Sequence, residues 1–456
     1  MKVALVFPRT RYPSGDPPLG VAYLAAALKE KTGKAPALID TTFSHDPLLH
    51  IRSELGKEKY DLVGISAMVT MAREARLAAR LAKELHPEAL VVAGGPHPTT
   101  LPVEVLEEPA FDAVCLGEGE QALAEAAEKG SLENVPGIYV RDGSGGITGE
   151  PASREADLDD LPFPALELLP MEEYLKHWFQ LDSVRPGLQG VPVMATRGCP
   201  FKCSYCQPTL DHLFGKGVRK RSPANVADEL EWRIEQFGIN AFLFADDTFI
   251  ADRAWVLSFC EELERREIGL TWGCNVRADL VDRELLSAMH RAGLGKIYMG
   301  IEVYDDERRR EVFNKRLTRE QVEDAARAAR ELGIRTQGYF MLGAPGESRG
   351  DVWDTVRYAC RLPVDDATFN ITTPLPGTLL YENHRERIVC RSEDMDYYKR
   401  YAFREENGLS QSFLSRAKVI AYGGFYGRPK RLAKQARSLG SVSEARRFLS
   451  KVRRVF

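Results

Sequence analysis

Three cysteines lie within eight residues, in the segment CPFKCSYC, with the spacing Cys199-x3-Cys203-x2-Cys206. Thiolates at this spacing can ligate zinc or an iron–sulfur cluster, form disulfides, or pack as small apolar groups. A structural zinc site takes four ligands, usually from a second pair of cysteines or histidines. No such pair follows at a suitable spacing, although His212 is near. A cluster on three thiolates fits better, because it leaves one iron open to an outside ligand.

The bulk composition is that of an ordinary globular protein. The chain has 456 residues, of which 44% are hydrophobic and 28% charged, enough for two or three domains. No apolar run reaches the roughly 18 to 20 residues of a membrane span, and the N-terminal segment does not read as a signal peptide. We therefore expect a cytoplasmic protein, in which disulfides are rare. Most of the five scattered cysteines are expected to be buried apolar residues: Cys115, Cys260, Cys274, Cys360 and Cys390.

The charge is unevenly distributed along the chain. From Arg416 to Phe456 there are twelve Lys and Arg against one acidic residue, Glu444, so the rest carries −15 of a total net charge of −4. A solvated helical face is the simplest interpretation of this basic tail. Contact with a phosphate-bearing substrate, or peripheral contact with a membrane, is the alternative. Basic residues alone identify no nucleic acid, and we expect no nucleic-acid partner.

The first 140 residues alternate between buried-strand and helix patterns. This alternation predicts an α/β fold with a doubly wound, Rossmann-like parallel sheet. Ligands of such sheets bind at the carboxyl ends of the strands. The expected strands lie at 3–8, 35–40, 61–67, 89–95 and 111–116. Unusual loops follow several of them, at 17–20, 66–71, 94–99 and 117–120, and all but 66–71 contain Gly or Pro.

A second alternating series occupies residues 191–385, after a linker at 141–190. Six strand–helix units predict a partial (β/α)6 barrel with active residues at the strand carboxyl ends, and the three cysteines directly follow its first strand. Ser222 and Pro223 mark the start of one of its helices. Residues 386–456 are basic, mainly helical in pattern, and read as a small C-terminal cap. The expected strands lie at 191–196, 241–246, 270–276, 296–302, 335–343 and 367–373.

The cysteine spacing, at the start of a six-unit βα series, resembles the radical S-adenosylmethionine (SAM) superfamily. The resemblance covers about 191 to 380. It implies a [4Fe–4S] cluster held by Cys199, Cys203 and Cys206, with SAM bound to the open iron and reductively cleaved to a 5′-deoxyadenosyl radical. It also implies an external one-electron reductant of the flavodoxin or ferredoxin type. The SAM-binding residues that it implies are Asp246, Asp247, Arg277, Glu302, Tyr339 and Met341.

These positions match the family's SAM contacts to different degrees. The stretch FADD, with its two aspartates, stands loosely where the family touches the methionyl amine; helix capping or turn formation is the alternative. Arg277 resembles the arginine that reaches the SAM carboxylate, a task for which its planar fork is suited. Glu302 resembles the residue that contacts the ribose or amine. A surface ion pair is the alternative for both. The segment 339–347, YFMLGAPGE, resembles the part of the family that lies against adenine.

The N-terminal part of the chain contains the segments PPLGVAYLAAALKE, DLVGISAMVT, AGGPHPT and LGEGE. Together they resemble the cobalamin-binding domain that precedes many radical SAM cores. Each segment is weak alone, but four occur in order before the cysteines. The D-x-H-x-x-G motif that supplies a cobalt ligand elsewhere is absent, so we expect no protein histidine below the cobalt, with the 66–71 loop covering that face. An architectural Rossmann-like domain is the alternative. The residues expected at cobalamin are Pro18, Leu19, Gly20, Ser66, Met68, Thr70, Gly94, Gly95, Pro96, His97, Gly117, Glu118 and Gly119.

The combined resemblance implies a cobalamin-dependent C-methyltransferase acting on a small molecule or lipid. In such enzymes the radical abstracts hydrogen from an unactivated carbon, and the methyl group comes from methylcobalamin. The alternative with the same cofactors is radical cyclisation, ring rearrangement or oxidation, as in tetrapyrrole ring cyclases. A cofactor carrier without turnover is a further alternative. Tyr298 and Thr373 are candidate substrate contacts, although packing is the simpler interpretation. The sequence does not identify the substrate or the oligomeric state.

Overall fold

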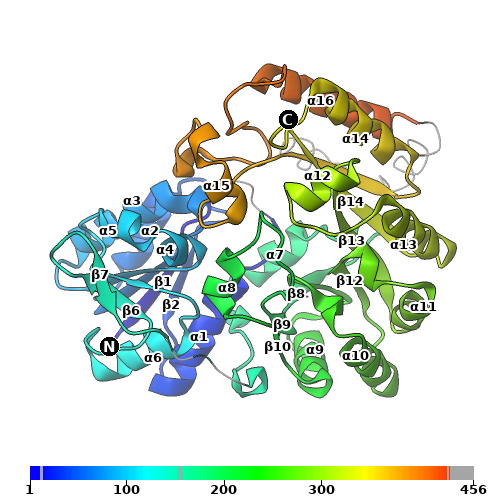
Figure 1. The fold of residues 1–456 in the computed structure, drawn as a ribbon. Helices are drawn as coiled ribbons and strands as arrows, with labels where there is room; N and C mark the ends of the chain where they lie inside the picture. The colour runs from blue at the N-terminus through cyan, green and yellow to red at the C-terminus, as the bar shows by residue number, and fades with distance from the viewer. Residues whose placement is uncertain (11–13, 153, 155–156, 429–430, 432–456) are drawn as a thin grey trace. The chain divides into compact units, whose positions relative to one another are not determined.

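A computed structural model describes residues 1–456 except 11–13, 153, 155–156, 429–430 and 432–456 (Figure 1). Most of the basic tail therefore lies outside the described residues. Contacts divide the rest into two compact units. The first unit contains residues 1–176, 208–220 and 392–394, and the second contains the other described residues. None of the described helices is long and apolar enough to cross a membrane.

The first unit is built on a seven-stranded sheet in the order β2-β1-β3-β4-β5-β6-β7. Strands β1 to β5 pair in parallel, and only β6 and β7 add antiparallel pairs at one edge. The strands are β1 (Val3–Phe7), β2 (Ala37–Asp40), β3 (Leu62–Ser66), β4 (Leu90–Gly94), β5 (Ala113–Cys115), β6 (Ile138–Arg141) and β7 (Ile147–Gly149). The helices are α1 (Leu19–Thr32), α2 (Pro47–Leu55), α3 (Ala72–Leu85), α4 (Pro96–Thr100), α5 (Pro102–Leu106), α6 (Glu120–Lys129), α7 (Met171–His177) and α8 (Thr209–Phe214).

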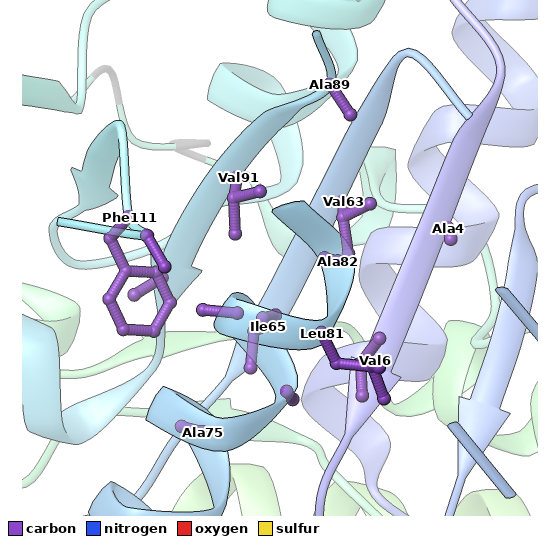
Figure 2. Packing of buried hydrophobic residues seen from close by; sticks show 14 of the residues in the cluster. Ala4, Val6, Val63, Ile65, Ala75, Leu81, Ala82, Ala89, Val91 and Phe111 are labelled. Atoms are coloured by element: carbon purple, nitrogen blue, oxygen red, sulfur yellow. The ribbon is translucent and has the colours of Figure 1, made fainter. Parts of the chain in front are cut away.

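Apolar side chains cover both faces of this sheet. Figure 2 shows one face, where Val6, Ile65 and Val91 of three neighbouring strands lie against Ala75 and Ala82 of α3. Small alanine side chains let the helix backbone approach the sheet closely, and interiors packed at this density leave few voids. Burying each valine or isoleucine side chain stabilises the fold by about 1.5–3 kcal/mol before conformational entropy is counted. The rigid sheet then fixes the loops at its carboxyl edge.

The second unit is built on six parallel strands in the order β15-β14-β13-β12-β11-β8. Within the part of the chain that the structure describes, β8 and β15 do not pair, so the barrel is open. The strands are β8 (Gly190–Val193), β11 (Ala241–Phe244), β12 (Thr271–Val276), β13 (Leu294–Glu302), β14 (Arg335–Leu342) and β15 (Asp366–Ile371). The helices are α9 (Pro223–Phe237), α10 (Arg253–Arg265), α11 (Arg283–Arg291), α12 (Asp306–Glu311), α13 (Arg319–Glu331), α14 (Arg349–Arg361), α15 (Leu379–Asn383) and α16 (Gln411–Tyr426).

The helix α16 lies against the free edge of β15. The Tyr422 hydroxyl accepts a hydrogen bond of 3.1 Å from the backbone N–H of Phe369. The Tyr426 hydroxyl accepts one of 3.1 Å from the N–H of Ala367 and donates one of 3.2 Å to the carbonyl of the same residue. Two side-chain hydroxyls therefore take the place of a neighbouring strand at this edge.

The structure confirms the fold class expected from the sequence. Both parallel sheets are present, with the doubly wound sheet first and the six-unit series after it. The helix expected at Ser222 begins there, with the serine side chain accepting from the N–H of Asn225 at 3.1 Å. The antiparallel pair β6–β7 was not predicted, because residues 141–149 are rich in glycine and read as the start of a linker.

Candidate active site

The cysteine loop follows β8 and the short strand β9 (Thr196–Arg197) in the second unit. None of its three cysteines is in a disulfide; Cys203 is buried, and Cys199 and Cys206 are half-buried. The backbone N–H groups of Cys206 and Gln207 both donate to the carbonyl of Cys203, at 3.1 and 3.0 Å. The loop therefore forms a compact turn around Cys203, which presents three sulfurs from one short segment.

Distant segments of the same unit fix this turn through the backbone. The N–H of Ser204 donates to the Phe313 carbonyl at 2.9 Å. The carbonyls of Ser204 and Gln207 accept from the N–H groups of Leu380 and Leu379, at 2.8 and 2.7 Å. These bonds require no particular side chain, so residue types in the sequence did not reveal them.

Polar side chains from the ends of β11 and β12 reach two of the sulfurs. The Thr248 Oγ1 lies 2.9 Å from the Cys199 Sγ. The Arg277 Nη1 lies 3.6 Å from the Cys203 Sγ, and its guanidinium lies 3.8 Å from the centre of the Phe201 ring. Arg277 also pairs with Asp279 at 2.9 Å. The arginine is thus next to the cysteine loop, at the carboxyl end of its strand, and its contact with SAM stays a prediction.

A buried polar network links the cysteine loop to β13. The Lys315 Nζ donates to the Glu302 Oε1 at 2.8 Å and to the Gly300 carbonyl at 2.9 Å. The Tyr205 hydroxyl donates to the same Glu302 oxygen at 2.9 Å. Tyr205 stands between two of the cysteines, so the network connects Glu302 directly to the loop. Glu302 was expected at the site from its position at the end of a strand, whereas Lys315 was not.

The backbone around Glu302 is unusual, and it explains how the carboxylate reaches the network. Glu302 has a φ of 66°, a conformation that residues other than glycine rarely adopt. The register between β13 and β14 shifts between Gly300 and Glu302. A Cβ added at Gly300 would lie 2.6 Å from the Glu302 Oε1 and 2.7 Å from the Lys315 Nζ. Only glycine leaves room for the ion pair at that point.

The two aspartates after β11 have different surroundings. Asp246 is buried, and its carboxylate accepts from the N–H groups of Ala195 and Thr196 and from the Thr196 hydroxyl. Burial raises the pKa of Asp246 to about 7. Asp247 is exposed, yet desolvation by the surrounding protein raises its pKa to about 6. Asp246 therefore holds the segment before the cysteine loop, whereas Asp247 is accessible to a ligand.

The remaining expected residues lie on β13 to β15. Tyr339 and Met341 are half-buried, and Met341 packs against the same apolar cluster as Tyr205. The rings of Tyr298 and Tyr339 stack with their centres 6.1 Å apart, and the Tyr298 hydroxyl donates to the Gln180 carbonyl at 2.6 Å. The Thr373 hydroxyl donates to the Ile371 carbonyl at 3.1 Å. Tyr298 and Thr373 thus have partners within the protein, as the packing interpretation expects.

Glu347 is a further buried carboxyl at this end of the barrel. It lies in the GAPGE segment directly after β14 and is 1% exposed. Its Oε2 accepts from the backbone N–H groups of Gly343 and Ala344, at 2.8 and 2.9 Å. Burial raises the pKa of Glu347 to about 7. The carboxyl group shapes the turn next to Met341, although the sequence analysis noted only the segment and not this residue.

Burial and charge act in opposite directions on the cysteines. Desolvation raises the pKa of Cys203, while the charges of Lys315 and Arg277 lower it. Burial also raises the pKa of Cys206, and the charge of Asp247 adds to the effect. Thiolate ligands would therefore gain from the two cations near Cys203. Three sulfurs, two nearby cations and a threonine hydroxyl suit a negatively charged iron–sulfur cluster.

In the described residues no three His, Cys, Asp or Glu side chains converge closely enough to hold one metal ion. A cubane cluster does not require such convergence, because each of its irons takes its own thiolate.

The expected cobalamin residues of the first unit lie at the carboxyl ends of its parallel strands. Each group follows or ends a strand, as ligand loops of doubly wound sheets do. Gly95 has a φ of 98°, and a Cβ there would lie 3.0 Å from the Ala67 carbonyl oxygen. Two tight loops therefore pack against each other. The positions are Pro18, Leu19 and Gly20 at the start of α1, Ser66, Met68 and Thr70 ending or after β3, Gly94, Gly95, Pro96 and His97 from the end of β4 to the start of α4, and Gly117, Glu118 and Gly119 after β5.

Two of these residues have charged neighbours within the first unit. Glu118 is buried and pairs with Arg219. His97 is buried with its Nε2 3.6 Å from the Glu104 Oε1, and desolvation lowers its pKa. Within the described residues the buried Nε2 of His97 has no hydrogen-bond partner, so the loop hydrogen-bonding interpretation of this ring nitrogen is not met by the chain itself.

A short segment from far along the chain also belongs to the first unit. The 3-10 turn η7 (Ser392–Asp394) contacts the turn η1 (Val69–Met71), which is part of the 66–71 loop. Glu393 pairs with Arg76, and the Ser392 hydroxyl donates to the Glu104 Oε1 at 3.1 Å. No local sequence pattern indicates this contact.

Comparison with known proteins identifies the families that the two parts of the chain resemble. Residues 193–359 match the model of the Radical SAM superfamily, and residues 12–127 match that of the B12 binding domain. A protein of Pyrococcus horikoshii, named as an uncharacterised methyltransferase, is 31% identical over 95% of this chain and 94% of its own length. The anaerobic magnesium-protoporphyrin IX monomethyl ester cyclase of Cereibacter sphaeroides is 31% identical over 87% of this chain and 65% of its own length.

A solved structure also has this fold over nearly the whole chain. The cobalamin-dependent S-adenosylmethionine radical enzyme OxsB, with aqua-cobalamin and S-adenosylmethionine bound, matches 99% of this chain and 71% of its own, with a TM-score of 0.76 and 18% identity. A B12-binding domain followed by an open barrel with a three-cysteine loop defines the cobalamin-dependent class of radical SAM proteins. The chain belongs to the radical SAM superfamily, in the group that carries this N-terminal domain. It is an enzyme, and the family's cofactors are a [4Fe–4S] cluster, SAM and cobalamin.

Proposed function

We propose that the protein transfers a methyl group to a carbon of a small molecule or lipid, using SAM, a [4Fe–4S] cluster and cobalamin. The observation that carries the proposal is the full-length likeness to a protein named as a methyltransferase, over 95% of this chain and 94% of that one. When bound, the cofactors would supply a reducible centre, a source of the deoxyadenosyl radical and a methyl carrier. The protein would bind and orient them and exclude water.

In this proposal Cys199, Cys203 and Cys206 hold the cluster, and Arg277 stabilises it and the SAM carboxylate next to it. The contact of Arg277 with Cys203 at 3.6 Å supports this placement. Asp247 would accept the methionyl ammonium, because its carboxylate is accessible, whereas Asp246 would serve the backbone.

The Glu302–Lys315 pair would order the loop that carries the ligands, through Tyr205. Tyr339 and Met341 would lie near the nucleoside. The loops at the strand ends of the first unit would hold cobalamin, and an external flavodoxin- or ferredoxin-type protein would deliver electrons.

The test needs no substrate. Purified anaerobically with cluster and cobalamin supplied, the reduced protein should form S-adenosylhomocysteine from SAM in proportion to its bound cobalamin. It should also form 5′-deoxyadenosine. The Cys203→Ala variant should lose 5′-deoxyadenosine. A protein that forms 5′-deoxyadenosine but no S-adenosylhomocysteine would contradict methyl transfer.

The second candidate is radical cyclisation or oxidation with the same cofactors. The likeness to a tetrapyrrole ester cyclase, at 31% identity over 87% of this chain, favours it. The chain spans 65% of that cyclase, so the remaining third of the cyclase has no counterpart in the match. Cyclisation transfers no methyl group, and the S-adenosylhomocysteine measurement therefore separates the two candidates.

A further inference from the structure

Thr248 is placed to act on the cysteine loop without belonging to it. It follows the two aspartates after β11, it is 4% exposed, and its Oγ1 lies 2.9 Å from the Cys199 Sγ. The residue precedes the turn η4 (Phe249–Ala251), yet its hydroxyl does not cap that turn. The hydroxyl is instead within hydrogen-bond distance of the Cys199 sulfur.

The chemistry of the ligand fixes the direction of this hydrogen bond. With Cys199 as a thiol, either atom can donate. A cysteine bound to iron is a thiolate, which has no proton and can only accept, so the threonine hydroxyl must then donate. Because Thr248 is buried, the bond lies in a medium of low polarity, where it acts more strongly on the sulfur than it would in water.

A hydrogen bond donated to a ligand sulfur changes the cluster's reduction potential. The added electron makes the cluster more negative, so a donor on one of its sulfurs stabilises the reduced form more than the oxidised form. We propose that the Thr248 hydroxyl donates to the Cys199 thiolate and thereby raises the reduction potential of the cluster, making the electron transfer that starts SAM cleavage more favourable. This inference rests on the proposed function, in which Cys199 is a cluster ligand.

The variant Thr248→Val tests the proposal, because valine keeps the shape of threonine and removes the hydroxyl. The experiment is an EPR-monitored redox titration of the reconstituted protein without SAM, with iron and sulfide measured per chain. We expect Thr248→Val to keep its cluster and to titrate at a lower potential. At the poise that half-reduces the native cluster, its ratio of reduced to oxidised cluster should fall several-fold. Thr248→Ser keeps a hydroxyl and should titrate close to the native protein.

A second variant controls for general destabilisation. Thr355 is 1% exposed, and its hydroxyl accepts from the Tyr304 N–H at 3.1 Å rather than contacting a cysteine. Thr355→Val should leave the potential unchanged. Equal potentials in Thr248→Val and the native protein would overturn the inference, and so would a loss of iron in Thr248→Val that Thr248→Ser does not share. A native protein that takes up no cluster would instead refute the proposed function itself.

Discussion

Lys315 and Glu302 form an ion pair in which each side chain is only 5% exposed, with the ammonium 2.8 Å from the carboxylate. They lie thirteen positions apart in the chain, one after β13 and one at its end. The Tyr205 hydroxyl donates to the same carboxylate oxygen. Burying two charges is costly unless each is compensated, so the pair and its hydrogen bonds depend on one another.

The stability of this pair can be measured by removing the cation. Lys315→Met leaves the Glu302 carboxylate buried without its ion-pair partner, which costs on the order of 3–5 kcal/mol in comparable sites. We expect a clearly lowered midpoint of thermal unfolding. The control is Arg283→Met, which breaks an exposed pair with Glu331 whose side chains are 63% and 49% exposed. Exposed pairs contribute about 0–1 kcal/mol, so equal losses in both variants would contradict the prediction.

Cys203 should be needed for the cluster but not for cobalamin. Cys203→Ala removes the sulfur at the centre of the cysteine turn, and we expect it to lose the cluster's iron and the cleavage of SAM. Because the expected cobalamin loops belong to the first unit, bound cobalamin should remain, as measured by absorbance after gel filtration. Cys390→Ala is the matched control, since it removes a half-buried thiol outside the loop and should keep full iron. Loss of cobalamin from Cys203→Ala would show that the two sites assemble together.

Glu347 should make stability depend on pH. Its folded pKa is raised from 4.5 to about 7, so the folded chain holds a proton that the unfolded chain releases. The contribution of protonated Glu347 to the free energy of unfolding is therefore fully present below about pH 4.5 and is lost as the pH rises to about 7. Glu347→Gln keeps an acceptor for the two N–H groups without the charge. Between pH 4.5 and 7 the native protein should lose more stability than Glu347→Gln in denaturant unfolding, and parallel curves would refute this.

Substitution of Gly20 tests whether cobalamin lies directly against the backbone at the start of α1. This glycine lies in α1, and apart from its own helix backbone and chain neighbours, a Cβ there would meet nothing within 4 Å. Gly20→Ala should therefore stabilise the chain, by about 0.5–1 kcal/mol, because alanine favours a helix. If the macrocycle lies against this backbone, the same variant should bind cobalamin less tightly in a titration. Gly423→Ala, equally open in α16, should stabilise without changing cobalamin affinity. Unchanged affinity in Gly20→Ala would remove Gly20 from the expected site.

Local patterns were enough to predict the sheets and the cysteine loop. Buried-strand runs separated by amphipathic helices predict parallel strands. Each run, such as the one before Cys199, can be recognised within a short stretch of the sequence. Two neighbouring aspartates, however, did not show which would hold the backbone and which would face outward. The separate environments of Asp246 and Asp247 depend on the path of the chain after β11, which composition does not encode.

Contacts between residues distant in the chain could not be predicted. Lys315 meets Tyr205 only because the register shift near Gly300 and the positive φ of Glu302 bring the end of β13 toward the cysteine loop. Thr248 is one of many threonines in the sequence, and only its short distance to the Cys199 sulfur in the folded chain distinguishes it from the others. Fold class follows from periodicity, whereas these contacts follow from tertiary geometry that a single sequence does not display.

The two tyrosines of α16 have a consequence beyond the strand that they touch. An open barrel ends in a strand whose free N–H and C=O groups can recruit a strand from another molecule, a common route to aggregation. Tyr422 and Tyr426 occupy such groups on Phe369 and Ala367, so that strand offers no template there. The open barrel therefore presents fewer free backbone groups along β15 to a strand of another molecule.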